Sequence, residues 1–152
     1  MWCGGNMRLK HFFIAATAVI LSNAYGANQN HPDPVEDVLE KCAYESQAGM
    51  RDCLSRSVSE SSKVLISAEK KLVSALKQWD EQPKFVSKAR DQLIRSDDAY
   101  LKYRDAQCAF ASALGGGAIG NALELRRLAC IFGLNMERAA HLTRLASSLS
   151  RK

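Results

Sequence analysis

Residues 108–130 read CAFASALGGGAIGNALELRRLAC and place a glycine-rich run between two cysteines. Within this stretch, GGGAIG has the glycine spacing of a nucleotide-binding loop, with Gly115, Gly117 and Gly120 at the required positions. Such a loop leaves a buried strand and opens a helix, but the preceding CAFASAL is alanine-rich and continues a helix. We therefore interpret the glycines as a connection between two helices, where glycine supplies the positive φ that reverses the chain.

The two cysteines of this stretch are placed symmetrically about the connection. The midpoint between Cys108 and Cys130 is residue 119, which lies within the glycine run. Residues at equal distances from the turn lie side by side in an antiparallel helix pair, so Cys108 and Cys130 are predicted to form a disulfide. The closed loop of about 22 residues would be worth about 3 kcal/mol in the chain-entropy description of disulfides.

The sequence has five cysteines, of which Cys3 precedes a second methionine and is set aside. The other four are Cys42, Cys53, Cys108 and Cys130. An even number favours two disulfides over a zinc site, whose ligands usually come in closely spaced pairs. Cys42 and Cys53 then pair by elimination. A continuous helix would hold them about 16 Å apart, so this pairing requires the chain to turn back before Ser46.

The N-terminal region has the pattern of a secretory signal peptide. Met7 precedes two basic residues, a ten-residue apolar run over residues 12–21, and small residues that end at Gly26. The run is too short to cross a bilayer, which needs about 20 apolar residues. We therefore predict a signal peptide over residues 1–26, an extended lead-in over residues 27–45, and a helical domain over residues 46–152 of a periplasmic or secreted protein.

The charge of the mature chain is mildly basic. The full sequence has 21 Lys and Arg against 16 Asp and Glu, and 19 basic residues remain after the predicted leader is removed. The resulting net charge of +3, without any run of five or more like charges, gives no support for nucleic-acid binding. The three histidines, His11, His31 and His141, are far apart in the sequence and predict no metal site.

Three long segments have the apolar spacing of amphipathic helices, over about residues 46–79, 84–114 and 121–148. Pro83 breaks the first from the second, and the glycine run breaks the second from the third. We predict an all-α fold, an antiparallel bundle of three long helices with two disulfides. The expected buried positions of the second helix are Val86, Ala89, Leu93, Tyr100, Tyr103, Phe110 and Leu114.

The segment YLKYRDAQC, residues 100–108, is assigned a structural role. Its tyrosines are expected to pack in the groove between helices, with Arg104 and Asp105 at the rim. The neighbouring Asp97 and Asp98 point about 100° apart on a helix and do not face each other as a catalytic pair. No serine or cysteine has a recognisable base, so we predict neither catalysis nor a cofactor.

Taken together, CAYESQAGMRDC, YLKYRDAQC, the glycine-rich loop and CIFGLNMERAAHL resemble the LprI-like family of exported bacterial proteins, named for a lysozyme inhibitor. Besides the four cysteines, the residues that carry the resemblance are Gln47, Met50, Tyr100, Tyr103, Arg104, Asp105, Arg138 and Leu142. The sequence departs from the family pattern at Tyr100, where tryptophan is usual, at Asn135, where threonine is usual, and in the first long helix.

The resemblance implies a helical, disulfide-bonded, exported protein without catalytic activity. Its most specific implication is lysozyme inhibition by protein binding. The alternative is a structural or stress-related module of the cell envelope with another ligand. Neither implies nucleic-acid binding or stable membrane insertion, and the oligomeric state stays open.

Overall fold

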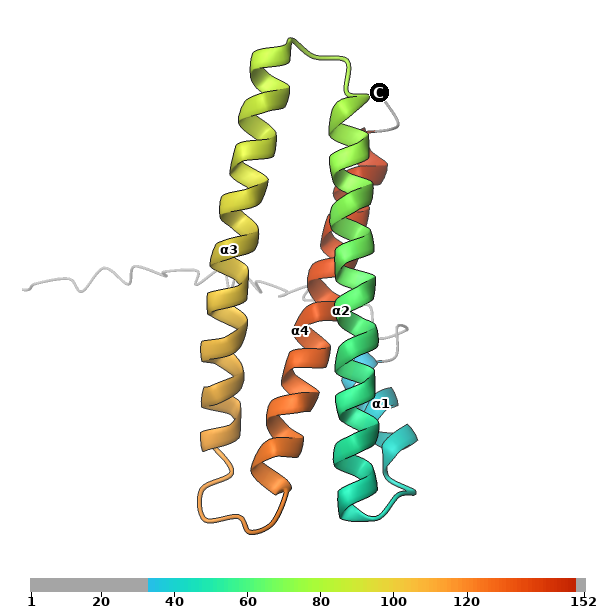
Figure 1. Cartoon of the computed structure of the whole chain (residues 1–152), viewed down its shortest axis with the longest axis vertical. Coiled ribbons are helices and arrows are strands. Elements are labelled where there is room, and N and C mark those ends of the chain that lie inside the picture. Colours follow the sequence, from blue (N-terminus) through green and yellow to red (C-terminus); the bar gives the residue numbers. More distant parts are fainter. Residues whose placement is uncertain (1–32, 150–152) are drawn as a thin grey trace, which may run out of the picture. The chain divides into compact units, whose positions relative to one another are not determined.

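The computed structural model describes residues 33–149 (Figure 1), so the predicted signal peptide and most of the lead-in lie outside the described residues. The described part is helical and contains no strand. Its four helices are α1 (Pro34–Cys42), α2 (Gln47–Lys77), α3 (Pro83–Ala113) and α4 (Ala122–Leu149). None of these helices is apolar enough along a sufficient length to span a membrane. The all-α class is confirmed, and the three-helix bundle is corrected to an arrangement of four helices.

Helix α1 shows that the prediction of an extended lead-in was wrong for this segment. The Asp33 carboxylate accepts a hydrogen bond from a first-turn N–H at 2.9 Å, and Pro34 occupies the first turn, where no N–H is needed. Glu36 and Asp37 place negative charge at the positive end of the helix dipole. Prolines among polar residues are also typical of extended segments, so the composition alone does not reveal these helix-starting signals.

The three long helices begin and end close to their predicted bounds. Ser46 caps α2, because its Oγ accepts a hydrogen bond from the Gly49 N–H at 3.2 Å. Pro83 stands in the first turn of α3, directly after the predicted break. Successive long helices run in opposite directions, and α4 packs against both α2 and α3 (Figure 1).

Both predicted disulfides are present. Cys42 and Cys53 have Cα atoms 5.8 Å apart, because α1 ends at Cys42 and the chain turns back before α2 begins. Cys108 of α3 and Cys130 of α4 have Cα atoms 5.5 Å apart and lie on either side of the glycine connection. The connection itself contains two glycines with positive φ, Gly116 at 56° and Gly120 at 68°, as the helix-reversal interpretation predicted.

Most of the apolar core lies between α2 and α4. One cluster is built from Leu65, Ala68, Leu72, Leu76, Ala139, Leu142 and Ala146. A second cluster, at the other end of these helices, is built from Val38, Cys42, Cys53, Leu54 and Leu128 and includes the first disulfide. Helix α1 approaches α4 closely at Gly133, where an added Cβ would meet a methyl group of Val35 at 2.5 Å. The absence of a side chain at Gly133 therefore lets α1 cover the second cluster.

Helix α3 is more exposed than predicted. The side chains of Tyr103, Phe110 and Leu114 were expected to be buried, but 55%, 57% and 66% of their surfaces are exposed. The face of α3 that is turned inward instead runs from Tyr100 through Arg104, which are both partly buried, to the buried Cys108, in steps of four residues. A prediction based on apolar side chains leaves out Arg104, because it is charged, and includes Tyr103, which lies on a different face of the helix.

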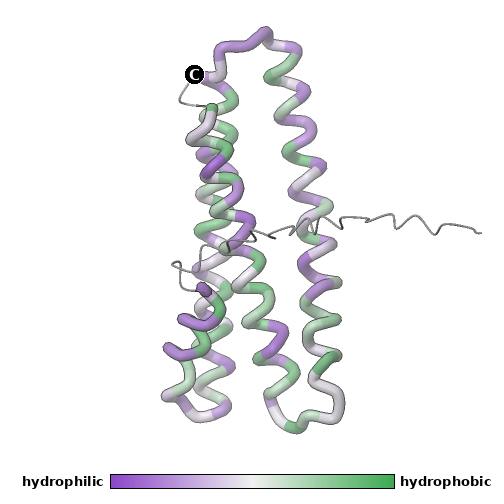
Figure 2. Tube along the Cα trace, turned by 180° about the vertical axis from the view of Figure 1, so that it is seen from behind, coloured by the Kyte–Doolittle hydropathy of each residue, from purple (hydrophilic) through white to green (hydrophobic). Residues whose placement is uncertain are grey.

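The two connections of α3 differ in polarity. In Figure 2 the connection between α2 and α3 is hydrophilic, whereas the connection between α3 and α4 is mostly neutral or hydrophobic. The first contains DEQP, and the second contains ALGGGAIG. The two ends of α3 therefore present different surfaces.

Candidate functional site

A polar network joins the three long helices, and Asn135 of α4 lies at its centre. The Asn135 side chain is fully buried, and its Nδ2 donates to Ser61 Oγ at 3.1 Å and to Ser62 Oγ at 3.2 Å on α2. Its Oδ1 accepts from Tyr100 OH at 3.3 Å and from Arg104 Nη1 at 3.2 Å on α3. The amide therefore satisfies its hydrogen-bonding groups inside the protein, as its burial requires.

Arg138, three residues further along α4, extends this network to the middle of α3. Its Nη2 donates to Asp97 Oδ1 at 2.8 Å and to Ser96 Oγ at 2.9 Å. The guanidinium carbon lies 5.5 Å from the centre of the Tyr100 ring, within range of a cation–π interaction. The side chains of Arg138 and Asp97 are only 16% and 24% exposed, so loss of either partner would leave a poorly solvated charge.

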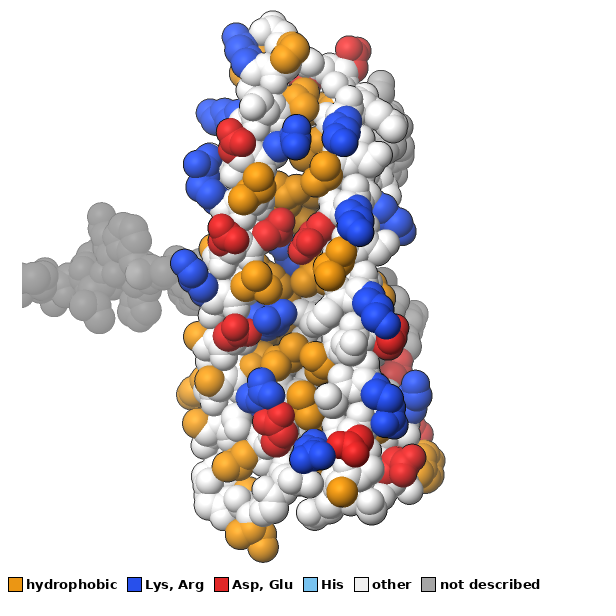
Figure 3. Space-filling model, in the orientation of Figure 1, with side chains coloured by type: hydrophobic (Ala, Val, Ile, Leu, Met, Phe, Trp, Pro, Cys, Tyr) orange, Lys and Arg blue, Asp and Glu red, His pale blue; other side chains and the backbone are white. Residues whose placement is uncertain are grey.

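The groove between α2 and α3 contains acidic side chains from both helices, on the face shown in Figure 3. Burial, and then the charge of Asp97, raise the pKa of Glu69, while Arg138 partly offsets them. Burial also raises the pKa of Tyr100 to about 12, against the opposing effect of the two neighbouring arginines. The Tyr100 phenol therefore stays a neutral hydrogen-bond donor at physiological pH.

The substitution Glu69→Gln is expected to stabilise the fold at neutral pH. The raised pKa of Glu69 means that folding disfavours its ionised form, so the parent is penalised at pH values above the folded pKa. Below the ordinary glutamate value of 4.5, Glu69 is neutral in both states and the penalty disappears. Melting temperatures should therefore be higher for the variant near neutral pH and converge with the parent near pH 3.

The matched control is Glu40→Gln, which removes one negative charge from an exposed position on α1. Its melting temperature should follow that of the parent more closely at both pH values. A Glu69→Gln variant that melts below the parent at neutral pH would contradict the assigned direction of the pKa shift.

Three of the family-motif residues meet in the network. They are Tyr100, Arg104 and Arg138, which come from α3 and α4. Leu142, one turn beyond Arg138, is 1% exposed and belongs to the apolar core beside the network. These four residues therefore have partners inside the protein, within the core formed by the long helices.

The other motif residues lie outside the network. Gln47 begins α2 and its backbone oxygen accepts a hydrogen bond from Asn121 Nδ2 at 3.4 Å. Met50 packs against the core cluster that includes the first disulfide. Asp105 is 67% exposed and pairs with Arg104 at 2.9 Å, whereas Tyr103 is exposed. The expected rim position fits Asp105 but is wrong for Arg104, whose side chain is 18% exposed and donates to the buried Asn135. The expected packing of Tyr103 is also wrong.

Several residues of the network were missed as partners from the sequence alone. Ser61 is a small polar residue among the apolar positions of α2, and in the sequence Asn135 stands out only as a departure from the family pattern. Asp97 was compared with Asp98, its neighbour in sequence, and not with Arg138 on another helix. A polar residue at a core position, such as Ser61 or Asn135, was the available signal, but its partners depend on how the helices align.

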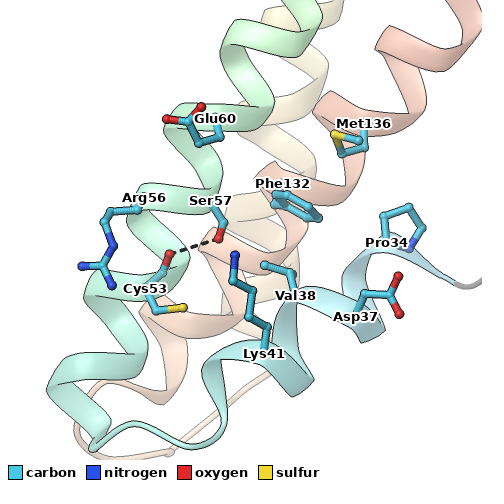
Figure 4. Close-up of a pocket in the computed structure, with 10 residues that line it drawn as sticks. All are labelled: Pro34, Asp37, Val38, Lys41, Cys53, Arg56, Ser57, Glu60, Phe132 and Met136. Carbon is cyan, nitrogen blue, oxygen red and sulfur yellow. Dashed lines mark hydrogen bonds between the residues drawn. The ribbon is translucent and has the colours of Figure 1, made fainter.

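A second candidate is a hollow between α1, α2 and α4, which Figure 4 shows. Its volume is about 520 Å³, and Val38, Phe132 and Met136 contribute apolar surface to it. The charged residues around it are Asp37, Lys41, Arg56 and Glu60. Two acidic and two basic side chains balance each other, so the hollow favours neither an anionic nor a cationic ligand.

The polar atoms of the Asn135 network are mostly occupied by one another. Within residues 33–149, no group of three or more His, Cys, Asp or Glu side chains is arranged to hold a metal ion. The only buried side-chain polar atom found without a hydrogen-bond partner in this part of the chain is Arg138 Nε. The network can therefore align and hold the long helices, and we assign it no reacting group.

The fold and its network define an all-helical domain held by two disulfides, with a polar network that includes two arginines between the three long helices. The family model described as lysozyme inhibitor LprI matches residues 40–142, about two thirds of the chain. The chain belongs to this family. No curated protein and no solved structure matches it.

Proposed function

We propose that this protein inhibits lysozyme by binding to it. The observation that carries the proposal is the family match over residues 40–142. The matched range includes both disulfides, the polar network and the glycine connection. The contacts described above stabilise the domain, and we assign a chemical step to none of the described residues. Inhibition by binding requires a stable surface and no reacting group, so it fits such a domain.

We also propose that the protein acts outside the cytoplasm. Disulfides persist in oxidising compartments, and both cysteine pairs of the described domain are bonded. The signal-peptide pattern over residues 1–26 lies outside the described residues and supports the same proposal from sequence. The binding domain would then comprise the predicted segment 46–152 together with α1, which the first disulfide ties to α2.

We assign the motif residues Tyr100, Arg104 and Arg138 to maintaining the fold. Their polar groups point to partners within the protein, as the hydrogen bonds to Asn135 and Asp97 show. A partner protein would therefore contact other residues. This separates the residues that identify the family from those that would recognise lysozyme.

A lysis assay tests the proposal. The purified protein with both disulfides intact is mixed with several lysozymes, and the rate of clearing of a bacterial cell-wall suspension is measured. At micromolar protein, the rate should fall by about tenfold for at least one lysozyme, which corresponds to a Kd well below that concentration. The reduced and alkylated protein is the control and should inhibit less. Unchanged lysis for every lysozyme would contradict the proposal.

A further inference from the structure

The end of the α3–α4 hairpin, residues 106–123, carries no charged side chain over 18 consecutive residues. Charged residues make up 24% of the whole chain, so a segment of this length would ordinarily contain about four. We call this segment the hairpin end. In Figure 3 the lower end of the molecule below α3 shows hydrophobic and uncharged side chains.

The hairpin end exposes large apolar side chains to solvent. Phe110, in the last turn of α3, and Leu114, directly after the helix, are four residues apart and are 57% and 66% exposed. Ile119, in the connection, is 89% exposed. Tyr103, seven residues before Phe110, lies on the same face of α3 as Phe110. Clustered apolar exposure of this kind is typical of a protein-binding surface.

The same segment is firmly held. The Cys108–Cys130 disulfide joins its two helices, and Ser112 Oγ donates a hydrogen bond to the Leu123 carbonyl at 2.9 Å across the hairpin. The Asn121 side chain donates to the backbone of Gln47 and so connects the hairpin end to α2. A surface fixed in this way loses little conformational entropy on binding, which favours affinity.

We propose that the hairpin end is the surface that contacts lysozyme, with Leu114 and Ile119 as apolar anchors; this inference rests on the proposed function. Many lysozymes are cationic, and a mildly basic chain has no long-range attraction to such a partner. The hairpin end reduces this difficulty, because its own 18 residues bring no like charge into the interface. The expected partner surface is an apolar or aromatic groove on a cationic enzyme.

A lipid bilayer is a poorer occupant of this surface. Binding to anionic lipids is strengthened by free basic residues beside the apolar segment. Here Arg104 is paired with Asp105 at 2.9 Å, and Arg127 is paired with Glu124 at 2.7 Å. This pairing neutralises two of the cations that flank the hairpin end. The exposed Arg126 and Lys102 remain beside it, fewer than the cluster of about four to eight basic residues typical of binding to anionic lipids.

The test compares three exposed apolar positions that receive the same substitution. Leu114→Lys and Ile119→Lys place a charge in the hairpin end, whereas Ile94→Lys places the same charge on an exposed site of α3 outside it. All three variants have the same net charge, so any difference between them is local. Circular dichroism should show parent-like helix content for each.

Binding to a c-type lysozyme, measured by surface plasmon resonance, should weaken by about tenfold or more for Leu114→Lys and Ile119→Lys and remain close to the parent for Ile94→Lys. The parent affinity should change little between about 0.05 and 0.5 M salt, because the interface lacks charges. Equal affinities for all three variants, or a steep loss with salt, would overturn the hairpin end as the contact surface while leaving inhibition itself intact.

Three further results would overturn the assignment of the hairpin end to lysozyme. A parent chain that neither binds nor inhibits any lysozyme would overturn both this inference and the proposed function. Ile119-dependent binding to vesicles of anionic phospholipid, or Ile119-dependent dimers in sedimentation, without Ile119-dependent lysozyme binding, would assign the surface to a bilayer or to a second copy and overturn the inference.

Discussion

Replacement of both Cys108 and Cys130 by alanine is expected to lower the free energy of unfolding by about 3 kcal/mol, because the disulfide closes a loop of 22 residues in the unfolded chain. The loss should be large for this protein, since α3 has few other anchors. Cys108 is the only fully buried side chain of α3. Urea denaturation followed by circular dichroism measures the change as a lower midpoint.

The matched control is the Cys42→Ala, Cys53→Ala variant, which opens a shorter loop of 11 residues. It should lose somewhat less stability in the chain-entropy description, and the loss should be felt first in α1. Hydrogen exchange separates the two variants: amides of α3 should become less protected in the first, and amides of α1 in the second. A Cys108→Ala, Cys130→Ala variant as stable as the parent would contradict the role of this disulfide as the main anchor of α3.

The substitution Asn135→Leu is expected to cost about 3 kcal/mol of stability, even though leucine is apolar and its side chain has the same branched shape. It leaves Arg104 Nη1 and the Tyr100 hydroxyl without their acceptor in a part-buried position. Stranding a buried donor costs about 1–3 kcal/mol, and more when the donor is charged. The measurement is again urea denaturation, with the slope checked to ensure a comparable unfolding transition.

A double-mutant cycle shows whether Asn135 acts through the network. Tyr100→Phe alone removes one hydrogen bond and should cost about 1 kcal/mol. In the Asn135→Leu background the same change should cost much less, because the partner of the hydroxyl is already gone. Fully additive effects would mean that Asn135 stabilises the fold by some means other than this contact.

Much of the helical framework could be predicted from local signals in the sequence. Ser46 and Pro83 are residues whose backbone and side-chain chemistry start a helix, and the glycines of the connection permit positive φ. The symmetry of Cys108 and Cys130 about that connection was sufficient to pair them. Each of these predictions depends on neighbours in sequence or on a single hairpin, where sequence distance and spatial distance are simply related.

The remaining features depend on how the helices align against one another. Arg104 lies on the inward face of α3 because Asn135 of α4 accepts its hydrogen bond, and nothing adjacent to Arg104 in sequence reveals this. For the same reason, Tyr103 was predicted to be buried and is exposed. Helix α1 was missed for a different reason: PDPVED contains the capping signals of a helix, but prolines among polar residues are also typical of an extended segment.

The interior and the surface of this protein are proposed to have different functions. The network and the disulfides hold the helices together, and the proposed contact surface lies at the hairpin end, which contains no charged residue. Substitutions in the network should therefore reduce stability before they reduce inhibition, whereas substitutions at Leu114 or Ile119 should reduce inhibition alone. Comparison of melting temperature with inhibitory potency in the same variants separates the two groups.

The most direct measurement of the central proposal is isothermal titration of the oxidised protein into a c-type lysozyme. We expect a saturable complex with a Kd at or below about 1 μM, corresponding to about −8 kcal/mol of binding free energy. A negative heat-capacity change should accompany it, because the proposed interface is apolar. The absence of binding to every lysozyme tested, by titration and by co-sedimentation at about 100 μM, would contradict lysozyme inhibition as the function of this protein.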